Sequence, residues 1–273
     1  MPSHYNIGIM QGRLSPKVKN MIQSFPTKFW VKEFLLAKRI GLNFVEWIID
    51  FDQYKDNPIL SNTGISLIKE LIQETEIYIP SICVDYFATY PLIFDEYKIE
   101  SKELLLNLID SCNRLNINII EIPLIGIASA KTKDAQEKYI EFFYSFEPFL
   151  KEKNLKFALE TDLEPKLQKN FINEININNI GLNYDIGNSA YWGYNLEEEI
   201  DYFGKNILNV HLKDCTPKDY SVQFGDGNAD FWLLFNLLNK INYQGDFVLQ
   251  GARGSNDYET VVQQLLFIKS YLK

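Results

Sequence analysis

Short apolar runs rich in β-branched residues alternate with longer stretches whose apolar residues recur at helical spacing, along almost the whole chain. The runs have the length and composition of buried strands, and the stretches between them are typical of amphipathic helices. The predicted strands are 5–10, 43–48, 77–84, 117–124, 156–160, 180–185, 207–213 and 246–250. The predicted helices are 30–40, 61–74, 101–115, 131–153, 164–176, 196–205, 230–241 and 257–272.

These elements form eight strand–helix units without a change of composition or a Pro/Ser-rich linker between them. Strands that alternate with helices lie parallel, and eight units in 273 residues are close to the ~250 residues of a (β/α)8 barrel. We therefore predict an α/β fold, a single (β/α)8 TIM barrel domain over residues 1–273. A doubly wound open sheet is the alternative, which the even repetition disfavours.

Two connections are longer than a tight turn requires. The polar loop 11–28 follows the first strand and places Gln11 and Arg13 directly beyond the strand end, where they can reach a bound ligand. The aromatic-rich segment 86–97 is either a lid over a pocket or packed surface cover. In the second strand, Glu46 shares a face with Phe44 and therefore points into the barrel or at the helices.

Composition and charge exclude several classes of protein. A net charge of −9 argues against nucleic acid as a partner, because binding to phosphate backbones needs clustered Lys and Arg. Three widely separated cysteines without CxxC spacing support neither a disulfide framework nor a cysteine zinc site. The sequence shows no signal peptide and no apolar segment near the ~20 residues that span a bilayer. We expect a soluble cytoplasmic protein with no membrane partner.

Four predicted strands end in a residue that can bind a metal ion. Glu160, Asp185, His211 and Gln250 close the fifth to eighth strands, and His211 is one of only two histidines in the chain, the other being His4. Because the C-terminal ends of parallel strands meet on one face, these side chains are predicted to converge. Three oxygen ligands and one imidazole suit Mn²⁺, Mg²⁺, Co²⁺ or Zn²⁺.

Six motifs in this order and spacing carry a resemblance to a known family. They are MQGRLS, ALETD, NYDIGN, NVHLKD, GDGNADF and LQGARG. With them, essentially the whole chain resembles the xylose-isomerase-like TIM-barrel superfamily of sugar and sugar-phosphate isomerases and epimerases.

The resemblance implies one divalent metal, most readily Mn²⁺, held by Glu160, Asp185 and His211. A fourth ligand in the superfamily is usually a second Glu, where this chain has Gln250. An amide oxygen can coordinate a metal, but the amide cannot act as a base at neutral pH. A second departure is Asn188, which stands where relatives have a substrate-contacting His and leaves a hydrogen-bonding group without a titratable proton.

The implied reaction is isomerisation or epimerisation of a sugar or sugar phosphate through an enediolate. Metal chelation of the carbonyl and the adjacent hydroxyl stabilises the enediolate, while Glu160 removes the carbon-bound proton. Returning that proton to the neighbouring carbon on the same face gives aldose–ketose isomerisation with one base, whereas epimerisation requires a second acid on the opposite face. Because Gln250 cannot supply it, an epimerase has to recruit another carboxylate. The candidates are Glu46, Asp85, Glu121 and Asp162.

Further residues are predicted to surround this site. Asn183 and Asn209 each precede a predicted ligand by two positions, so they share its face and can orient it. Lys213 and Arg253 lie just past predicted ligands and are the plausible anion contacts, with the loop 225–227 between them as a weak phosphate-binding signal. Gln11, Arg13, Glu46 and Asn188 complete the predicted substrate contacts.

Two other functions stay open at this point. One is a metal-dependent dehydratase or lyase resembling inosose dehydratase, which uses the same enediolate but expels a β-hydroxyl. The other is a noncatalytic sugar-binding barrel, motivated by Gln250 in place of the second carboxylate. Superfamily members are often dimers or tetramers, so a homo-oligomer is also open.

Overall fold

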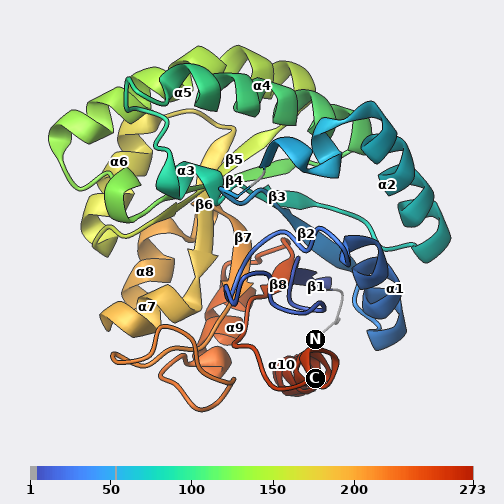
Figure 1. The fold of residues 1–273 in the computed structure, drawn as a ribbon. Coiled ribbons are helices and arrows are strands. Elements are labelled where there is room, and N and C mark those ends of the chain that lie inside the picture. The colour runs from blue at the N-terminus through green and yellow to red at the C-terminus, as the bar shows by residue number, and fades with distance from the viewer. Residues whose placement is uncertain (1–4, 53, 273) are drawn as a thin grey trace. The chain divides into compact units, whose positions relative to one another are not determined.

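The computed structural model describes residues 5–52 and 54–272, and His4 lies outside them. The strands pair in chain order and β8 pairs with β1, so the sheet is closed, as predicted for a (β/α)8 barrel (Figure 1). The strands are β1 Ile7–Met10, β2 Phe44–Ile48, β3 Ser81–Cys83, β4 Ile119–Leu124, β5 Lys156–Thr161, β6 Ile180–Asp185, β7 Ile207–Leu212 and β8 Phe247–Leu249. The helices are α1 Trp30–Ile40, α2 Asn62–Thr75, α3 Tyr86–Thr89, α4 Lys98–Leu115, α5 Lys133–Lys153, α6 Pro165–Ile175, α7 Ile186–Trp192, α8 Leu196–Phe203, α9 Phe231–Lys240 and α10 Asp257–Tyr271.

Local signals explain where several elements begin and end. Ser61 and Asp230 accept backbone N–H bonds at the starts of α2 and α9, and Gly41 ends α1 in the left-handed conformation. The strand predicted over 77–84 is confined to β3 because Pro80, which precedes it, has no N–H to donate to a sheet. The short helices α3 and α7 were not predicted, since each is too brief to show helical periodicity.

The chain divides into two compact units: unit 1 is Met1–Val45 with Asn183–Lys273, and unit 2 is Glu46–Leu182. Each contains strand pairs with parallel register. A single domain over residues 1–273 stays a prediction. In the described residues, no helix combines the length and the apolar character needed to cross a bilayer.

In unit 1, β8 lies between β1 and β7. Phe247 pairs with Ile7 on one side and with Val210 on the other. Gly8 of β1 allows the ring of Phe44 to pack against the strand, because a Cβ at this glycine would lie 2.2 Å from that ring. The register of β8 places Val248 beside His211, so it fixes which residues of these two strands share a face.

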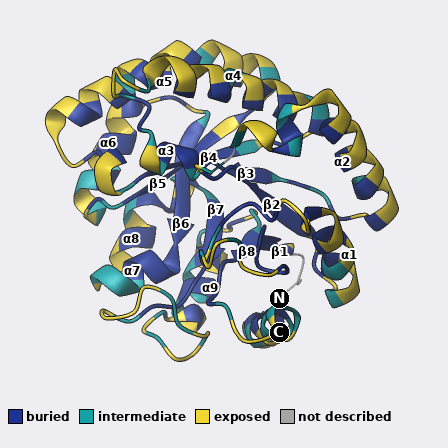
Figure 2. Cartoon of the chain, viewed as in Figure 1, coloured by how far each residue is buried: buried dark blue, intermediate teal, exposed yellow. Residues whose placement is uncertain are grey.

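In unit 2, β2 to β6 pair in sequence, and aromatic side chains of α5 pack against β5. Phe143 and Phe146 of α5 both lie within 6.2 Å of Phe157 on β5, measured between ring centroids. Strands are buried along nearly their whole lengths, whereas the long helices alternate buried and exposed positions (Figure 2). This pattern is the period-of-3.6 amphipathicity on which the helix predictions depend.

Several aromatic side chains of the segment 86–97 pack against one another. Tyr86, Phe87 and Leu92 are each at most 2% exposed. The rings of Tyr86 and Tyr90 lie 4.6 Å apart, and the ring of Tyr97 contacts that of Tyr90 at 5.1 Å. These contacts agree with packed surface cover, and the segment also lines a pocket through Leu92, Ile93 and Asp95, so its role as a lid stays a prediction.

Candidate metal and substrate site

His211 and Gln250 share one face of the sheet in unit 1. His211 on β7 pairs with Val248 on β8. Side chains two residues apart on a strand point to the same face. Gln250 therefore points to the same face as His211, two residues closer to the C-terminal end of the sheet. The backbone N–H of Gln250 donates to Leu212 O at 2.9 Å and continues the ladder to this position. His211 is fully buried and Gln250 is 9% exposed.

Only the nitrogen of the Gln250 carboxamide forms a hydrogen bond with the described residues. Its Nε2 donates to Oε1 of Gln23 at 3.0 Å. Its Oε1 is buried and accepts no hydrogen bond from the described residues. A buried oxygen without a donor is costly unless something outside the chain completes it, so this oxygen is suited to a ligand or metal ion.

Asp185 ends β6 and begins α7. Its Oδ1 accepts the backbone N–H of Asn188 at 3.1 Å, which caps the helix, and its Oδ2 lies 2.9 Å from Nζ of Lys213. The two charged side chains are 1% and 6% exposed. Because both are buried and paired, Asp185 is held in one orientation on the strand end.

Lys213 is committed to neighbours within unit 1. Besides Asp185, its ammonium donates to Oδ1 of Asn188 at 2.7 Å and lies 4.0 Å from the centroid of the Tyr220 ring. The hydroxyl of Tyr220 also donates to Oδ1 of Asn188. Lys213 and Asn188 therefore form a polar cluster with Tyr220 beside Asp185, and their predicted contacts with substrate stay predictions.

The first residues of the loop after β1, from Gln11 to Ser15, are buried. Gln11 is fully buried and Arg13 is 5% exposed. Arg13 donates to the backbone oxygen of Ile22 and to Oε1 of Gln23, the same oxygen that Gln250 uses. The predicted substrate contacts Gln11 and Arg13 thus lie in a segment bonded to the candidate ligand Gln250 through Gln23.

Glu33 of α1 holds the start of this loop by hydrogen bonds to its backbone. Its carboxylate accepts the backbone N–H groups of Gly12 and Leu14 at 3.0 Å each. Burial raises the pKa of Glu33 from its ordinary 4.5 to about 7, although these N–H bonds and the charge of Arg253 lower it. Gly12 takes a positive φ of 91°, which a residue with a side chain rarely adopts.

Arg253 makes internal contacts that the sequence does not predict. Its guanidinium lies 2.9 Å from Oδ1 of Asp257 and donates to the backbone oxygen of Ser15. The Arg253 side chain is only 3% exposed. Its predicted role as an anion contact stays a prediction, and the structure gives this side chain a role in joining the loops after β1 and β8.

Asn183 and Asn209 occupy the positions that parity predicts. Each is 2% exposed, and each lies two residues before a candidate ligand on its own strand, Asp185 on β6 and His211 on β7. Their predicted role in orienting those ligands stays a prediction.

Four carboxylates of unit 2 act on the buried thiol of Cys83. Burial raises the pKa of this thiol well above its ordinary value, and the charges of Asp85, Glu121, Glu46 and Glu160 raise it further. Glu46, Glu121 and Glu160 are each at most 8% exposed. The strands of unit 2 therefore gather several buried acids, one of which is the predicted base Glu160.

Glu46 and Asp162, two of the candidate second acids, each accept a hydrogen bond from a serine hydroxyl. Glu46 accepts a hydrogen bond from the hydroxyl of Ser81 at 2.6 Å. Asp162 lies 2.8 Å from Nζ of Lys131 and accepts the hydroxyl of Ser129, so it ties together the loops after β4 and β5. Asp162 is consequently the poorer candidate for a second catalytic acid.

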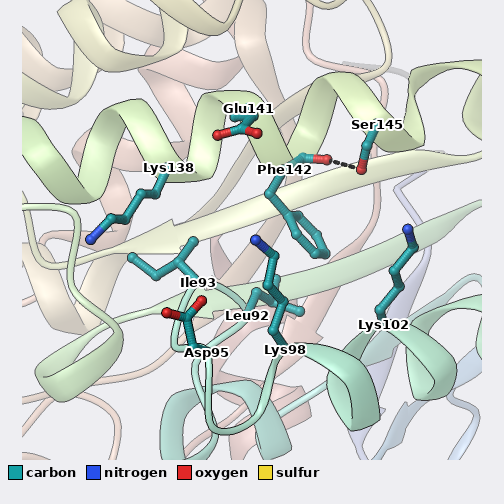
Figure 3. Close-up of a pocket in the computed structure, with 9 residues that line it drawn as sticks. All are labelled: Leu92, Ile93, Asp95, Lys98, Lys102, Lys138, Glu141, Phe142 and Ser145. Carbon is teal, nitrogen blue, oxygen red and sulfur yellow. Dashed lines mark hydrogen bonds between the residues drawn. The ribbon is translucent and has the colours of Figure 1, made fainter.

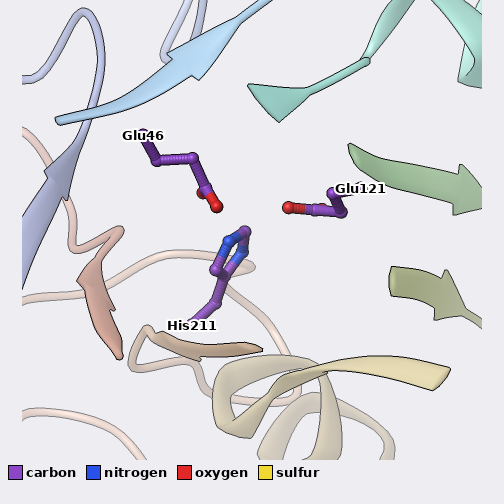
Figure 4. A group of neighbouring side chains, drawn as sticks. All are labelled: Glu46, Glu121 and His211. Atoms are coloured by element: carbon purple, nitrogen blue, oxygen red, sulfur yellow. The ribbon is translucent and has the colours of Figure 1, made fainter. Parts of the chain in front are cut away.

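Two groups of three side chains in the described part of the chain offer ligand atoms within 4.8 Å of one another. One is Glu160, Asp185 and His211, the three that the sequence predicts. The other is Glu46, Glu121 and His211, which Figure 4 draws. All five are buried. The structure thus offers a carboxylate and imidazole metal site, in which His211 belongs to both groups.

Sequence reasoning gave no role to the buried acids Glu33 and Glu199. The Glu199 carboxylate accepts the hydroxyls of Tyr184 and Ser189, which flank Asp185, and burial raises its pKa from 4.5 to about 7. A signal was present, because Glu33 falls with Phe34 in the buried stripe of α1, and Glu199 falls in the buried stripe of α8. A charge inside an apolar stripe indicates a buried bonding role.

A pocket in unit 2 lies away from these residues. It has a volume of about 360 Å³ between α4 and α5, and Figure 3 shows Lys98, Lys102 and Lys138 around it with the apolar side chains Leu92 and Phe142. None of the residues that line it is a predicted site residue. The pocket therefore adds nothing to the candidate site.

Comparison with known proteins shows the family to which the chain belongs. The model of the xylose isomerase-like TIM barrel family matches residues 34–271, and the chain belongs to that family. A Haemophilus influenzae protein, SgbU, named as a proposed L-ribulose-5-phosphate 3-epimerase, is 29% identical over 81% of this chain and 83% of its own. The L-ribulose-5-phosphate 3-epimerase UlaE of Shigella flexneri is 24% identical over 81% of each chain.

Solved structures show the same fold. The 3-keto-D-glucoside 4-epimerase YcjR from E. coli superposes with a TM-score of 0.76 at 17% identity, over 97% of this chain and 99% of that one. At this identity the likeness concerns the fold alone. Family and fold therefore agree with the resemblance that the sequence motifs carry.

Proposed function

We propose that this protein is a metal-dependent isomerase or epimerase of a sugar or sugar phosphate. The observation that carries the proposal is the group of ligand atoms from Glu160, Asp185 and His211, within 4.8 Å of one another, in a chain of the xylose isomerase-like family. The relatives named as L-ribulose-5-phosphate 3-epimerases support a sugar as the small-molecule partner.

The residues present fit a divalent cation. Two carboxylates and an imidazole form the donor set, and Oε1 of Gln250 is a buried oxygen with no hydrogen-bond donor among the described residues. Glu160, Asp185, His211 and Gln250 would hold the ion. Such a donor set is rich in oxygen and suits Mn²⁺ first, with Mg²⁺, Co²⁺ and Zn²⁺ as alternatives. When bound, the ion supplies polarisation of the substrate carbonyl and its neighbouring hydroxyl.

The chain's own residues perform the proton transfer. Glu160, acting as a carboxylate, removes the proton from the carbon next to the carbonyl, and in isomerisation it delivers that proton to the neighbouring carbon, which was the carbonyl carbon of the substrate. Lys213 and the N–H of Asn188 hold Asp185 in place, so the acid beside the reacting atoms does not rotate away. Asn183 and Asn209 orient Asp185 and His211 from the same strands.

Isomerisation and epimerisation differ in the need for a second acid. Gln250 cannot donate or accept a proton at neutral pH. Glu46 and Glu121 are buried carboxylates that group with His211, and they are the candidates for delivery to the opposite face. With neither engaged, Glu160 alone catalyses aldose–ketose isomerisation. The cytoplasmic location and the homo-oligomer expected from the sequence remain predictions.

A deuterium-exchange screen tests the proposal. The purified protein, loaded with Mn²⁺ in D₂O, is incubated with aldoses, ketoses, their phosphates and inososes, and incorporation at carbon is followed by NMR. We expect metal-dependent exchange with at least one sugar, abolished by EDTA. Inversion at the exchanged carbon identifies an epimerase, and a new carbonyl position identifies an isomerase.

Two outcomes would contradict the proposal. Loss of water from an inosose would identify the dehydratase alternative. Sugar binding without exchange at any carbon, in protein shown to contain Mn²⁺, would identify a noncatalytic binding barrel.

A further inference from the structure

A long loop joins β7 to α9 (Figure 1), and its backbone closes around a carboxylate of its own chain. Asp214 is fully buried and accepts backbone N–H bonds from Cys215, Gly225, Gly227 and Ala229, each between 2.8 and 3.0 Å. We call residues 215–229 the Asp214 loop. Convergent N–H groups around an oxyanion form an anion cradle, and here the anion is internal.

This arrangement explains the glycines that resembled a phosphate-binding loop. A Cβ at Gly227 would lie 2.1 Å from Oδ1 of Asp214, and Gly225 takes a positive φ of 91°. Gly227 is therefore required by the close approach of the loop to Asp214, and Gly225 by its positive φ. Their N–H groups are used by Asp214, so they do not form a phosphate site.

The closed loop presents Tyr220 to the candidate site. The N–H of Val222 donates to Asp214 O at 2.8 Å, and Sγ of Cys215 donates to the backbone oxygen of Tyr220 at 2.6 Å. These bonds hold the backbone around Tyr220, and the hydrogen bond from its hydroxyl to Oδ1 of Asn188 directs the side chain. The ring meets that of Tyr191 on α7 edge-on, with the centroids 5.2 Å apart.

Tyr220 is linked to the candidate ligand Asp185 by one side chain. The ammonium of Lys213 lies 4.0 Å from the ring centroid and 2.9 Å from Oδ2 of Asp185. Even so, Tyr220 remains 47% exposed. An aromatic ring held rigidly beside a site, with much of its surface open, is the common means of packing against the C–H groups of a bound organic molecule.

We propose that Tyr220 is a substrate-contacting residue and that Asp214 is the positioning residue that fixes it. The ring packs on the carbon chain of the sugar, and the part of the substrate at the Asp214 loop is a hydroxylated, uncharged carbon chain and not a phosphate. This inference rests on the proposed function, since it needs a sugar in the site.

The test compares sugar binding among variants in a Glu160→Gln background, where substrate is bound but not turned over. The probe is the sugar that the wild type exchanges, free and phosphorylated, and titration calorimetry gives Kd. We expect Tyr220→Leu to raise Kd about tenfold for both forms, because the ring is lost. Tyr220→Phe keeps the ring and should change Kd by less than about threefold.

Asp214→Asn removes the negative charge that accepts the backbone N–H groups of the loop. We expect it to raise Kd as Tyr220→Leu does and to make the Asp214 loop cleavable by protease. In the otherwise wild-type enzyme, Tyr220→Leu and Asp214→Asn should raise KM while kcat stays within about threefold. The matched control is Asp226→Asn, which removes an exposed carboxylate from the same loop and should match the parent in every measurement.

A measurement without substitutions supplements these variants. In the wild-type holoenzyme, saturating sugar should protect Tyr220 from nitration by tetranitromethane, as mapped by peptide mass spectrometry. The inference is overturned if Tyr220→Leu leaves Kd within twofold, if Tyr220 is not protected, or if the loss is confined to the phosphorylated sugar. If the wild type exchanges a sugar but the Tyr220 variants bind that sugar with an unaltered Kd, this inference alone is rejected. Failure to bind any sugar of the panel would reject the proposed function as well.

Discussion

At the scale of single residues, the amide of Gln250 limits the chemistry that the candidate site can perform. Its Oε1 has no donor among the described residues, while its Nε2 bonds to Gln23. An amide in this position supplies an oxygen to a cation but neither charge nor basicity. In the proposed reaction, proton abstraction is therefore assigned to Glu160, which the sequence identifies as the carboxylate at the end of the fifth predicted strand.

Glu160→Gln should slow exchange strongly while leaving the fold intact. The amide keeps a coordinating oxygen and the size of the side chain but cannot take a proton, so the rate of deuterium incorporation should fall by about 10²–10⁴-fold. NMR of the exchanged sugar in D₂O measures this rate. Glu164→Gln, an exposed residue on the same connection, is the matched control. Exchange within tenfold of wild type would show that another group is the base.

Gln250→Glu should strengthen metal binding. A carboxylate adds a negative charge at the buried oxygen that now lacks a donor, so Kd for Mn²⁺ should fall about tenfold or more, a change of roughly 1.4 kcal/mol. Titration calorimetry on metal-free protein measures the effect, with the exposed Gln244→Glu as control. An unchanged Kd would mean that Gln250 does not face the ion.

At the scale of elements, buried acids on helices hold the loops that carry the site. Glu33 of α1 fixes the loop after β1 through Gly12 and Leu14, and Glu199 of α8 holds the residues on either side of Asp185. Both carboxyls have a pKa raised to about 7 by burial. These helices therefore stabilise the site by bonding to backbone and hydroxyl groups as well as by packing.

Stability should fall as the pH rises from about 4.5 to 7. With the pKa of Glu33 raised from 4.5 to about 7, the folded protein binds more protons than the unfolded chain in this window. The unfolding free energy therefore decreases as pH increases and loses this contribution above pH 7. Glu33→Gln should reduce the slope without removing it, because Glu199 acts in the same direction.

Urea unfolding at pH 5, 6, 7 and 8 measures that slope. Glu137→Gln, an exposed position on α5, serves as the control and should follow the wild type. A Glu33→Gln slope identical to the wild-type slope would show that the carboxyl of Glu33 does not titrate in this range.

At the scale of the whole molecule, bound metal should stabilise the fold. The proposed ligands come from β5, β6, β7 and the end of β8, which are far apart in sequence and are brought together only by folding. An ion that binds the folded chain alone adds about 2.7 kcal/mol at 100 times its Kd. Mn²⁺ should therefore raise the melting temperature by several degrees, and EDTA should reverse the rise.

His211→Gln should abolish that stabilisation, because it removes the imidazole common to both ligand groups. Asp226→Asn should retain it. Scanning calorimetry with and without Mn²⁺ measures both. A metal-induced rise of equal size in His211→Gln would place the ion elsewhere.

Much of the fold was predictable because its cause is local. Apolar periodicity located every strand, and Gly41, Ser61 and Asp230 marked helix ends as their backbone preferences require. Errors arose where a single residue overrides the pattern, as Pro80 does before β3. The closed strand order followed from the count of units.

The sequence by itself determined the barrel and the strand-end residues Glu160, Asp185, His211 and Gln250, since both follow from a period that each strand or helix carries within it. Only the tertiary structure decided which polar groups form hydrogen bonds within the chain itself. Arg253 bonds to the backbone of Ser15, 238 positions away, and Asp214 takes the N–H groups of its glycine loop. Such partners are chosen by folding, because a buried donor must be satisfied by whatever acceptor the fold brings near it.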